Sequence, residues 1–104
     1  MNALSALADP TRRRIVELLA ERERDVSELL AHFPISQPAV SRHLRVLRDH
    51  GLVRARPEAQ RRVYSLDPAP LAELDDWLGR YRPFWAQRLD ALEMELRRGR
   101  KENP

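Results

Sequence analysis

Residues 36–44 read SQPAVSRHL, a pattern typical of the start of an amphipathic helix. Ser36 belongs to the residue types preferred at an N-cap, and Pro38 fits the first turn, where a missing backbone N–H costs nothing. The apolar positions that follow are spaced four and three residues apart and are Val40, Leu44 and Leu47. Gly51 is a typical C-terminal stop. The sequence therefore predicts a helix over residues 36–50 with one buried face.

The outer face of this helix carries polar side chains close to its N-terminus, namely Gln37, Ser41, Arg42 and Arg45. Glutamine pairs well with adenine, arginine with guanine, and serine with a base or a phosphate. A helix N-terminus also favours a nearby phosphate. The face suits the major groove of DNA, although an ordinary solvated surface helix would show the same periodicity.

Shorter helices are expected before this one. Residues 2–8 are small and apolar enough for a short helix, and Asp9 followed by proline predicts the start of a second helix over residues 10–22. Asp25 with Glu28 three residues later forms the signature of a capping box, which starts a third helix. That helix ends before a proline, and a turn of three to four residues leads to the helix over 36–50.

The next segment predicts a β-hairpin. Residues 52–56 and 62–66 alternate apolar and polar side chains, and residues 57–61 lie between them as a loop. The expected tip is basic because it carries Arg61 and Arg62. Helix, turn, helix and hairpin in this order predict a winged helix-turn-helix, in which the second helix of the pair enters the major groove.

The charge distribution points to the same region. The 104-residue chain has a net charge of +3 and no cysteine. Residues 36–62 contain seven arginines against two acidic residues, a net charge of +5, whereas residues 68–104 are balanced. Such a basic segment is the electrostatic footprint of a protein that binds nucleic acid. A solvated surface is the alternative for an arginine cluster taken alone.

The C-terminal third predicts a long helix over residues 68–99, with a kink or short break at Pro83. Its apolar stripe comprises Leu71, Leu74, Leu78, Tyr81, Trp85, Leu89, Leu92 and Leu96. A helix this apolar on a small domain needs a partner. The aromatic cluster Trp77, Tyr81, Phe84 and Trp85 is interpreted as dimer core, and an effector pocket lined by aromatic rings is the alternative.

Several of these motifs together resemble the ArsR (ArsR/SmtB) family of bacterial regulators. The resemblance covers residues 3–66 through specific motifs, and residues 67–96 through helical pattern and aromatic placement. The motifs are ALADPTRRRI (6–15), SQPAVSRHL (36–44), VLR (46–48), GLV (51–53) and RRVYSL (61–66). The resemblance implies a mostly α fold with a small β-hairpin wing, a single domain over 1–104, and a long C-terminal helix for dimerisation. It also implies a homodimer that represses transcription at a roughly palindromic double-stranded DNA operator.

The resemblance and the residue patterns together select two sets of site residues. The DNA-binding set comprises Ser36, Gln37, Pro38, Ser41, Arg42, His43, Arg45, Arg61 and Arg62. The dimer-interface set comprises Leu4, Leu7, Leu74, Trp77, Leu78, Tyr81, Trp85, Leu89 and Leu92. The recognition helix is expected at 36–50, the wing at 52–66 and the dimerisation helix at 68–99.

The chain departs from the metal-sensing members of that family. It has no cysteine for their thiolate site, and its last helix offers Glu73, Asp75 and Asp76 but no histidine. Neither a metal nor another cofactor is therefore expected. The chain looks more like the metal-independent subgroup, for which an unidentified small-molecule effector is the remaining ligand. The wing tip also lacks the glycine often found there.

Other functions fit the sequence less well. The sequence contains neither a Gly-rich phosphate loop nor an evident triad of titratable residues, so an enzyme is not predicted. A winged helix that docks proteins would show apolar anchors on its outer face, where this chain has polar and basic side chains. No apolar run approaches the length of a membrane span and no signal peptide is evident, so a cytoplasmic location is expected.

Overall fold

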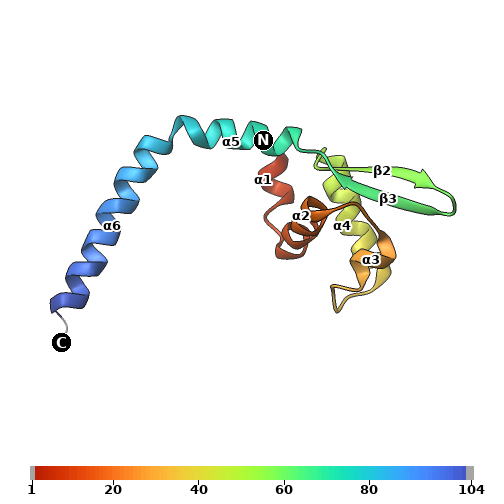
Figure 1. Ribbon diagram of the computed structural model, residues 1–104, viewed down its shortest axis with the longest axis horizontal. Coiled ribbons are helices and arrows are strands. Elements are labelled where there is room, and N and C mark those ends of the chain that lie inside the picture. The colour runs from red at the N-terminus through yellow and green to blue at the C-terminus, as the bar shows by residue number, and fades with distance from the viewer. Residues whose placement is uncertain (1, 103–104) are drawn as a thin grey trace. The chain divides into compact units, whose positions relative to one another are not determined.

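A computed structural model describes residues 2–102, and side-chain burial over residues 3–99. The elements in chain order are α1 (Asn2–Ala6), α2 (Pro10–Glu21), β1 (Arg24–Asp25), α3 (Val26–Leu30), α4 (Gln37–Asp49), β2 (Val53–Glu58), β3 (Arg61–Leu66), α5 (Ala69–Arg80) and α6 (Arg82–Glu102). They divide into two compact units, Met1–Ala72 and Glu73–Pro104. Figure 1 shows the helices of the first unit gathered at the base of the β2–β3 hairpin. The predicted mostly α fold with a hairpin wing is confirmed.

The core of the first unit is built from the apolar faces of α2, α3 and α4, closed by β2 and β3. Its fully buried large side chains are Ile15, Leu18, Leu29, Val40, Leu44, Leu47 and Leu52. The three residues predicted to line the inner face of α4 are all 0% exposed. Burial of this face fixes which side of α4 points outward.

Side-chain caps start the three helices of this core as the sequence predicted. The Asp9 carboxylate accepts hydrogen bonds from the backbone N–H of Thr11 (2.8 Å) and Arg12 (3.1 Å). Asp25 and Glu28 form a complete capping box, and the Ser36 hydroxyl accepts from Ala39 N–H at 3.3 Å. Each cap satisfies backbone donors that the first helical turn leaves free.

The end of α4 is closed by a Schellman motif. Gly51 has a φ of 76°, a conformation that costs glycine little. The N–H of Leu52 donates to the carbonyl of Leu47 at 2.9 Å, and the N–H of Gly51 donates to that of Arg48 at 3.0 Å. The chain therefore leaves α4 in a fixed direction, which sets where the hairpin begins.

Two arginines in the first turn of α2 reach back to α1. Arg12 Nε donates to the Ala6 carbonyl at 2.6 Å, and Arg13 Nη1 donates to the carbonyls of Leu7 (3.0 Å) and Ala8 (3.3 Å). The positive end of the helix dipole disfavours cations at this place. The hydrogen bonds to carbonyls at the end of α1 offset that cost and hold α1 against α2.

The sheet has three antiparallel strands in the order β1-β3-β2. The two-residue strand β1 was not predicted; it pairs Arg24 with Tyr64 and Asp25 with Val63. The five-residue loop predicted over 57–61 is wrong, because β2 and β3 continue to the pair Glu58–Arg61 and leave a two-residue turn. Pro57 is accommodated within β2 because β2 is an edge strand, where a missing N–H is tolerated.

The turn of the hairpin has an unfavourable residue at its first position. Ala59 has a φ of 56°, a region that residues with a Cβ rarely adopt and that two-residue hairpin turns require. Ala59→Gly is expected to stabilise the protein by about 0.5–1 kcal/mol, since relief of strain exceeds the greater entropy of glycine in the unfolded chain. Urea unfolding would measure this change.

The matched control for that substitution is Ala20→Gly at an exposed position in α2, where glycine is expected to destabilise by about 1 kcal/mol. If the free energy of unfolding rises for Ala59→Gly and falls for Ala20→Gly, the positive φ of Ala59 is the cause of the difference. A loss of stability for Ala59→Gly would contradict it.

The second unit contains most of α5 and the whole of α6. The predicted break in the long helix is present, at Tyr81, two residues before Pro83. Pro83 has no N–H to donate to the Gly79 carbonyl and its ring crowds that carbonyl, so α5 ends and a new helix starts with Pro83 in its first turn. No side chain of the described α5 or α6 residues is buried. Trp77 and Tyr81 nevertheless pack together, with ring centroids 5.1 Å apart.

Candidate nucleic-acid interface

The outer face of α4 carries the polar side chains that the sequence predicted for it. Ser36, Gln37, Pro38, Ser41, Arg42 and Arg45 are all exposed. Ser36 also serves as the N-cap, so its hydroxyl already accepts one backbone hydrogen bond. The opposite face of the helix is locked in the core, and the exposed set therefore has a rigid support.

His43 occupies a different environment from its neighbours on α4. Its side chain is half-buried, and its Nδ1 lies 3.4 Å from Arg12 Nη1. The Arg12 side chain in turn donates a hydrogen bond to the Ala6 carbonyl at the end of α1 and forms an ion pair with Asp9, the N-cap of α2. His43 therefore connects α4 to the preceding helices, and its predicted contact with DNA stays a prediction.

The arginines of the basic segment divide into two groups. Arg54 pairs with Asp67 at 2.9 Å, Arg56 pairs with Glu23, and Arg61 pairs with Asp25 at 3.1 Å. Within residues 2–102, by contrast, no ion pair is found for Arg42, Arg45, Arg48 or Arg62. The uncompensated positive charge of the segment thus lies on α4 and at the wing tip.

An open groove separates the start of α3 from the wing tip. It is lined by Asp25, Val26, Ser27, Gln37, Gln60, Arg61 and Arg62. Three predicted site residues, Gln37, Arg61 and Arg62, therefore meet at one groove although they come from different elements. The predicted residues Ser41, Arg42 and Arg45 lie farther along α4 and do not line it.

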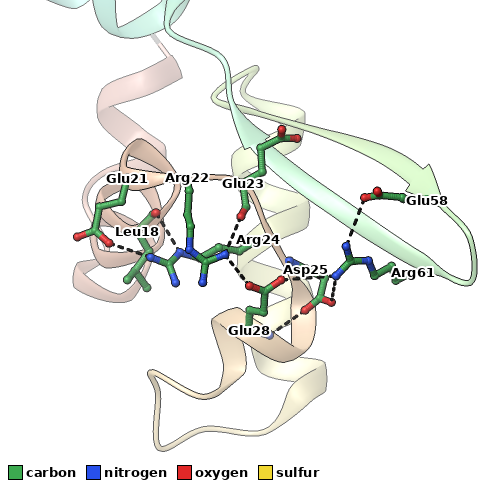
Figure 2. A network of polar contacts seen from close by, with 9 residues as sticks. All are labelled: Leu18, Glu21, Arg22, Glu23, Arg24, Asp25, Glu28, Glu58 and Arg61. Carbon is green, nitrogen blue, oxygen red and sulfur yellow. Dashed lines mark hydrogen bonds and ion pairs between the residues drawn. The ribbon is translucent and has the colours of Figure 1, made fainter.

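One ion-pair network crosses this groove and was missed by sequence reasoning. Figure 2 shows Arg61 of the hairpin pointing toward the carboxylates of Asp25, Glu28 and Glu58. The backbone N–H of Glu28, and then Arg61, lower the pKa of Asp25 below its ordinary value. The hydrogen bond from Arg61 to Asp25 likewise raises the pKa of the guanidinium. Asp25 thus has two functions, as helix cap and as partner of the wing.

Arg24 holds in place the segment that carries Asp25. It is the one buried charged residue among the described side chains, at 7% exposure. Its Nε donates to the Leu18 carbonyl at 3.1 Å, and its Nη2 pairs with Glu21 at 2.8 Å (Figure 2). Buried charges need such partners. The anchor fixes β1, and with it the position of Asp25.

The predicted dimer-interface residues are mostly exposed. On α5 and α6, Leu74 is half-buried, and the other residues of the set run from 37% exposure at Trp77 to 63% at Leu89. In the first unit Leu4 is 50% exposed, whereas Leu7 packs partly against the core. Soluble proteins rarely leave so many large apolar side chains on one helical segment without a partner.

Among the side chains described, no three His, Asp or Glu residues gather in a group that would hold a metal ion. None of the helices over residues 2–102 has both the length and the hydropathy needed to cross a membrane.

Comparison with known proteins assigns the chain to a family. Residues 9–55 match the family described as bacterial regulatory protein, arsR family. The chain is 52% identical over 87 residues to the HTH-type transcriptional regulator Rv2034 of Mycobacterium tuberculosis, covering 84% of this chain and 78% of the relative. It is 32% identical over 77 residues to the transcriptional repressor SdpR of Bacillus subtilis, covering 74% of this chain and 86% of the relative.

A solved structure agrees with these sequence matches. An ArsR-like transcriptional regulator from Rhodococcus sp. RHA1 superposes with a TM-score of 0.70 at 29% identity, covering 89% of this chain and 88% of that one. The family resemblance predicted from the sequence motifs is confirmed. The chain belongs to the arsR family of bacterial regulators and is a DNA-binding transcriptional regulator rather than an enzyme.

Proposed function

We propose that the protein is a homodimeric repressor that reads a roughly palindromic double-stranded operator with α4 and contacts flanking DNA with its wing. In this proposal residues 1–104 act as a single winged helix-turn-helix domain, with the C-terminal helices as its dimerisation arm. The protein acts where the chromosome lies, in the cytoplasm, and is associated with the nucleoid when bound.

The outer face of α4 is the observation that supports the reading of DNA bases by this helix. Gln37, Ser41 and Arg42 are exposed near the N-terminus of a helix whose other face is fully buried. Glutamine is suited to pair with adenine and arginine with guanine, and serine is suited to contact a base or a phosphate. Because Arg42 has no ion pair within residues 2–102, contact with DNA breaks no described interaction.

The homodimer is supported by the exposed apolar side chains of α5 and α6. Trp77, Tyr81 and Trp85 are between 37% and 47% exposed, and a second copy of the same helices would remove them from water. A two-fold interface of this kind would present two copies of α4 to DNA about one helical turn apart. This geometry requires an operator with two related half-sites.

Fluorescence anisotropy would test the proposal. The protein would be titrated into duplex DNA from its own promoter region and into random duplex at two salt concentrations, with the mass of the complex measured. Tight, salt-sensitive and sequence-preferring binding of two chains per duplex is the expected result. Equal affinity for both duplexes, together with failure to enrich any sequence from a random library, would reject sequence-specific binding.

A further inference from the structure

We propose that Arg61 is a positioning residue that fixes the wing to α3 through Asp25, and that its neighbour Arg62 is the cation that the wing offers to DNA. This inference rests on the proposed function, because it concerns how the wing of a DNA-binding protein is held. Arg61 and Arg62 are adjacent and both belong to the predicted DNA-binding set, but they have different roles in this proposal.

The geometry around Arg61 supports the positioning part. Its Nη1 lies 3.1 Å from Asp25 Oδ2 and 3.7 Å from Glu28 Oε1, and its Nη2 lies 3.5 Å from Glu58 Oε2. The pair with Asp25 joins residues 36 positions apart in the chain (Figure 2). A guanidinium between three carboxylates is already neutralised and is a poor phosphate ligand.

Asp25 itself is rigidly placed, so it provides a fixed point for the wing. Its Oδ1 accepts the N–H of Glu28 at 2.8 Å, which leaves Oδ2 for Arg61. Its backbone pairs with Val63 across β1 and β3, and the preceding residue is the buried Arg24. The tip of the hairpin is thereby tied to the helix-turn-helix beyond what strand pairing alone provides.

Arg62 has the opposite character. It is exposed, lines the same groove, and has no ion pair in the described part of the chain. Arg61 and Arg62 are consecutive residues of β3, so fixing Arg61 toward α3 also fixes where Arg62 lies at the groove. Loss of the Asp25–Arg61 pair would release the wing and raise the entropic cost of placing Arg62 on DNA.

The competing interpretation is that Asp25 masks Arg61 and that Arg61 transfers to a phosphate when DNA arrives. The two interpretations predict opposite signs for one substitution. Asp25→Asn keeps an amide oxygen to accept the Glu28 N–H but removes the charged partner of Arg61, and asparagine caps helices about as well as aspartate. If Asp25 masks Arg61, the variant binds DNA more tightly; if Asp25 positions the wing, it binds more weakly.

The experiment measures DNA affinity by anisotropy on a duplex that the wild-type protein selects from a random library. We expect Asp25→Asn to weaken binding by about threefold to fivefold, in the range of an exposed charge pair. The matched control is Asp49→Asn, the same charge change at an exposed α4 residue with no ion pair among the described residues. Loss of a negative charge there should leave binding unchanged or strengthen it slightly.

A double-mutant cycle and salt titrations complete the test. If the pair acts as a unit, Asp25→Asn combined with Arg61→Gln binds no more weakly than Arg61→Gln alone. Arg62→Ala should reduce the slope of log affinity against log salt concentration by about 0.9 for each wing on the DNA, which is about 1.8 for a dimer, whereas Arg61→Gln should leave the slope unchanged. Circular dichroism would show that each variant retains its helices.

Three results would overturn the inference: tighter binding by Asp25→Asn, additive effects in the cycle, or a reduced salt slope for Arg61→Gln. Failure of the wild-type protein to bind any duplex would instead reject the proposed function. The two failures are therefore distinguishable within one set of titrations.

Discussion

Leu89→Glu is expected to convert the protein from a dimer to a monomer and to weaken operator binding by about 100-fold to 10,000-fold, the range in which two linked binding modules exceed one. Leu89 is 63% exposed and lies in the middle of the predicted apolar stripe of α6. A carboxylate placed there would have to be buried in the interface without a partner, which is costly. Analytical ultracentrifugation would measure the mass, and anisotropy the affinity.

The matched control for this variant is Gln87→Glu. Gln87 is exposed on the same helix and receives the same charge change, but it lies outside the stripe. We expect it to remain dimeric and to bind DNA as the wild-type protein does. A dimeric Leu89→Glu variant would show that the copies associate elsewhere, and a monomeric wild-type protein would remove the dimer from the proposal altogether.

Arg42→Ala is expected to weaken binding to the selected duplex by about 1–3 kcal/mol, roughly 5-fold to 150-fold, and to relax specificity at one base pair of each half-site. The reason is the loss of a bidentate contact to a guanine edge from an exposed guanidinium that has no partner in residues 2–102. Affinities for the selected duplex and for variants with single base changes would reveal which position loses discrimination.

Arg48→Ala provides the comparison on the same helix. Arg48 is also exposed, but it lies in the last turn of α4, away from the N-terminal end that reaches base edges. We expect Arg48→Ala to cause a small loss of affinity that is the same for every DNA sequence. If Arg42→Ala weakened binding equally on selected and random DNA, Arg42 would be a phosphate ligand and would not read a base.

The elements of the first unit could be predicted because their signals are local. Asp9, Asp25, Ser36 and Gly51 each mark a helix boundary within a few residues, and all four perform that function in the structure. The buried face of α4 follows equally from spacing alone. These features depend on backbone hydrogen bonding and on helical periodicity, which neighbouring residues determine.

The features that sequence reasoning missed are those without local signals. A strand of two residues, β1, is too short to show alternation, and the turn at Ala59 lacks the glycine that usually marks a positive φ. The pair between Asp25 and Arg61 joins segments that are distant in the sequence, so no local pattern predicts it. Of the candidate site, the exposed face of α4 could be foreseen, but the neutralisation of three wing arginines required the folded chain.

The position of β2 at the edge of the sheet has a consequence for the protein in a crowded cell. An unpaired strand edge is a template on which another chain can add a strand, and this is a common route to aggregation. Here the edge strand carries Arg54, Arg56 and Pro57 in succession around a single alanine. The missing N–H of Pro57 and the two long, exposed arginine side chains make β2 a poor template, so two wings are kept from joining into a continuous sheet.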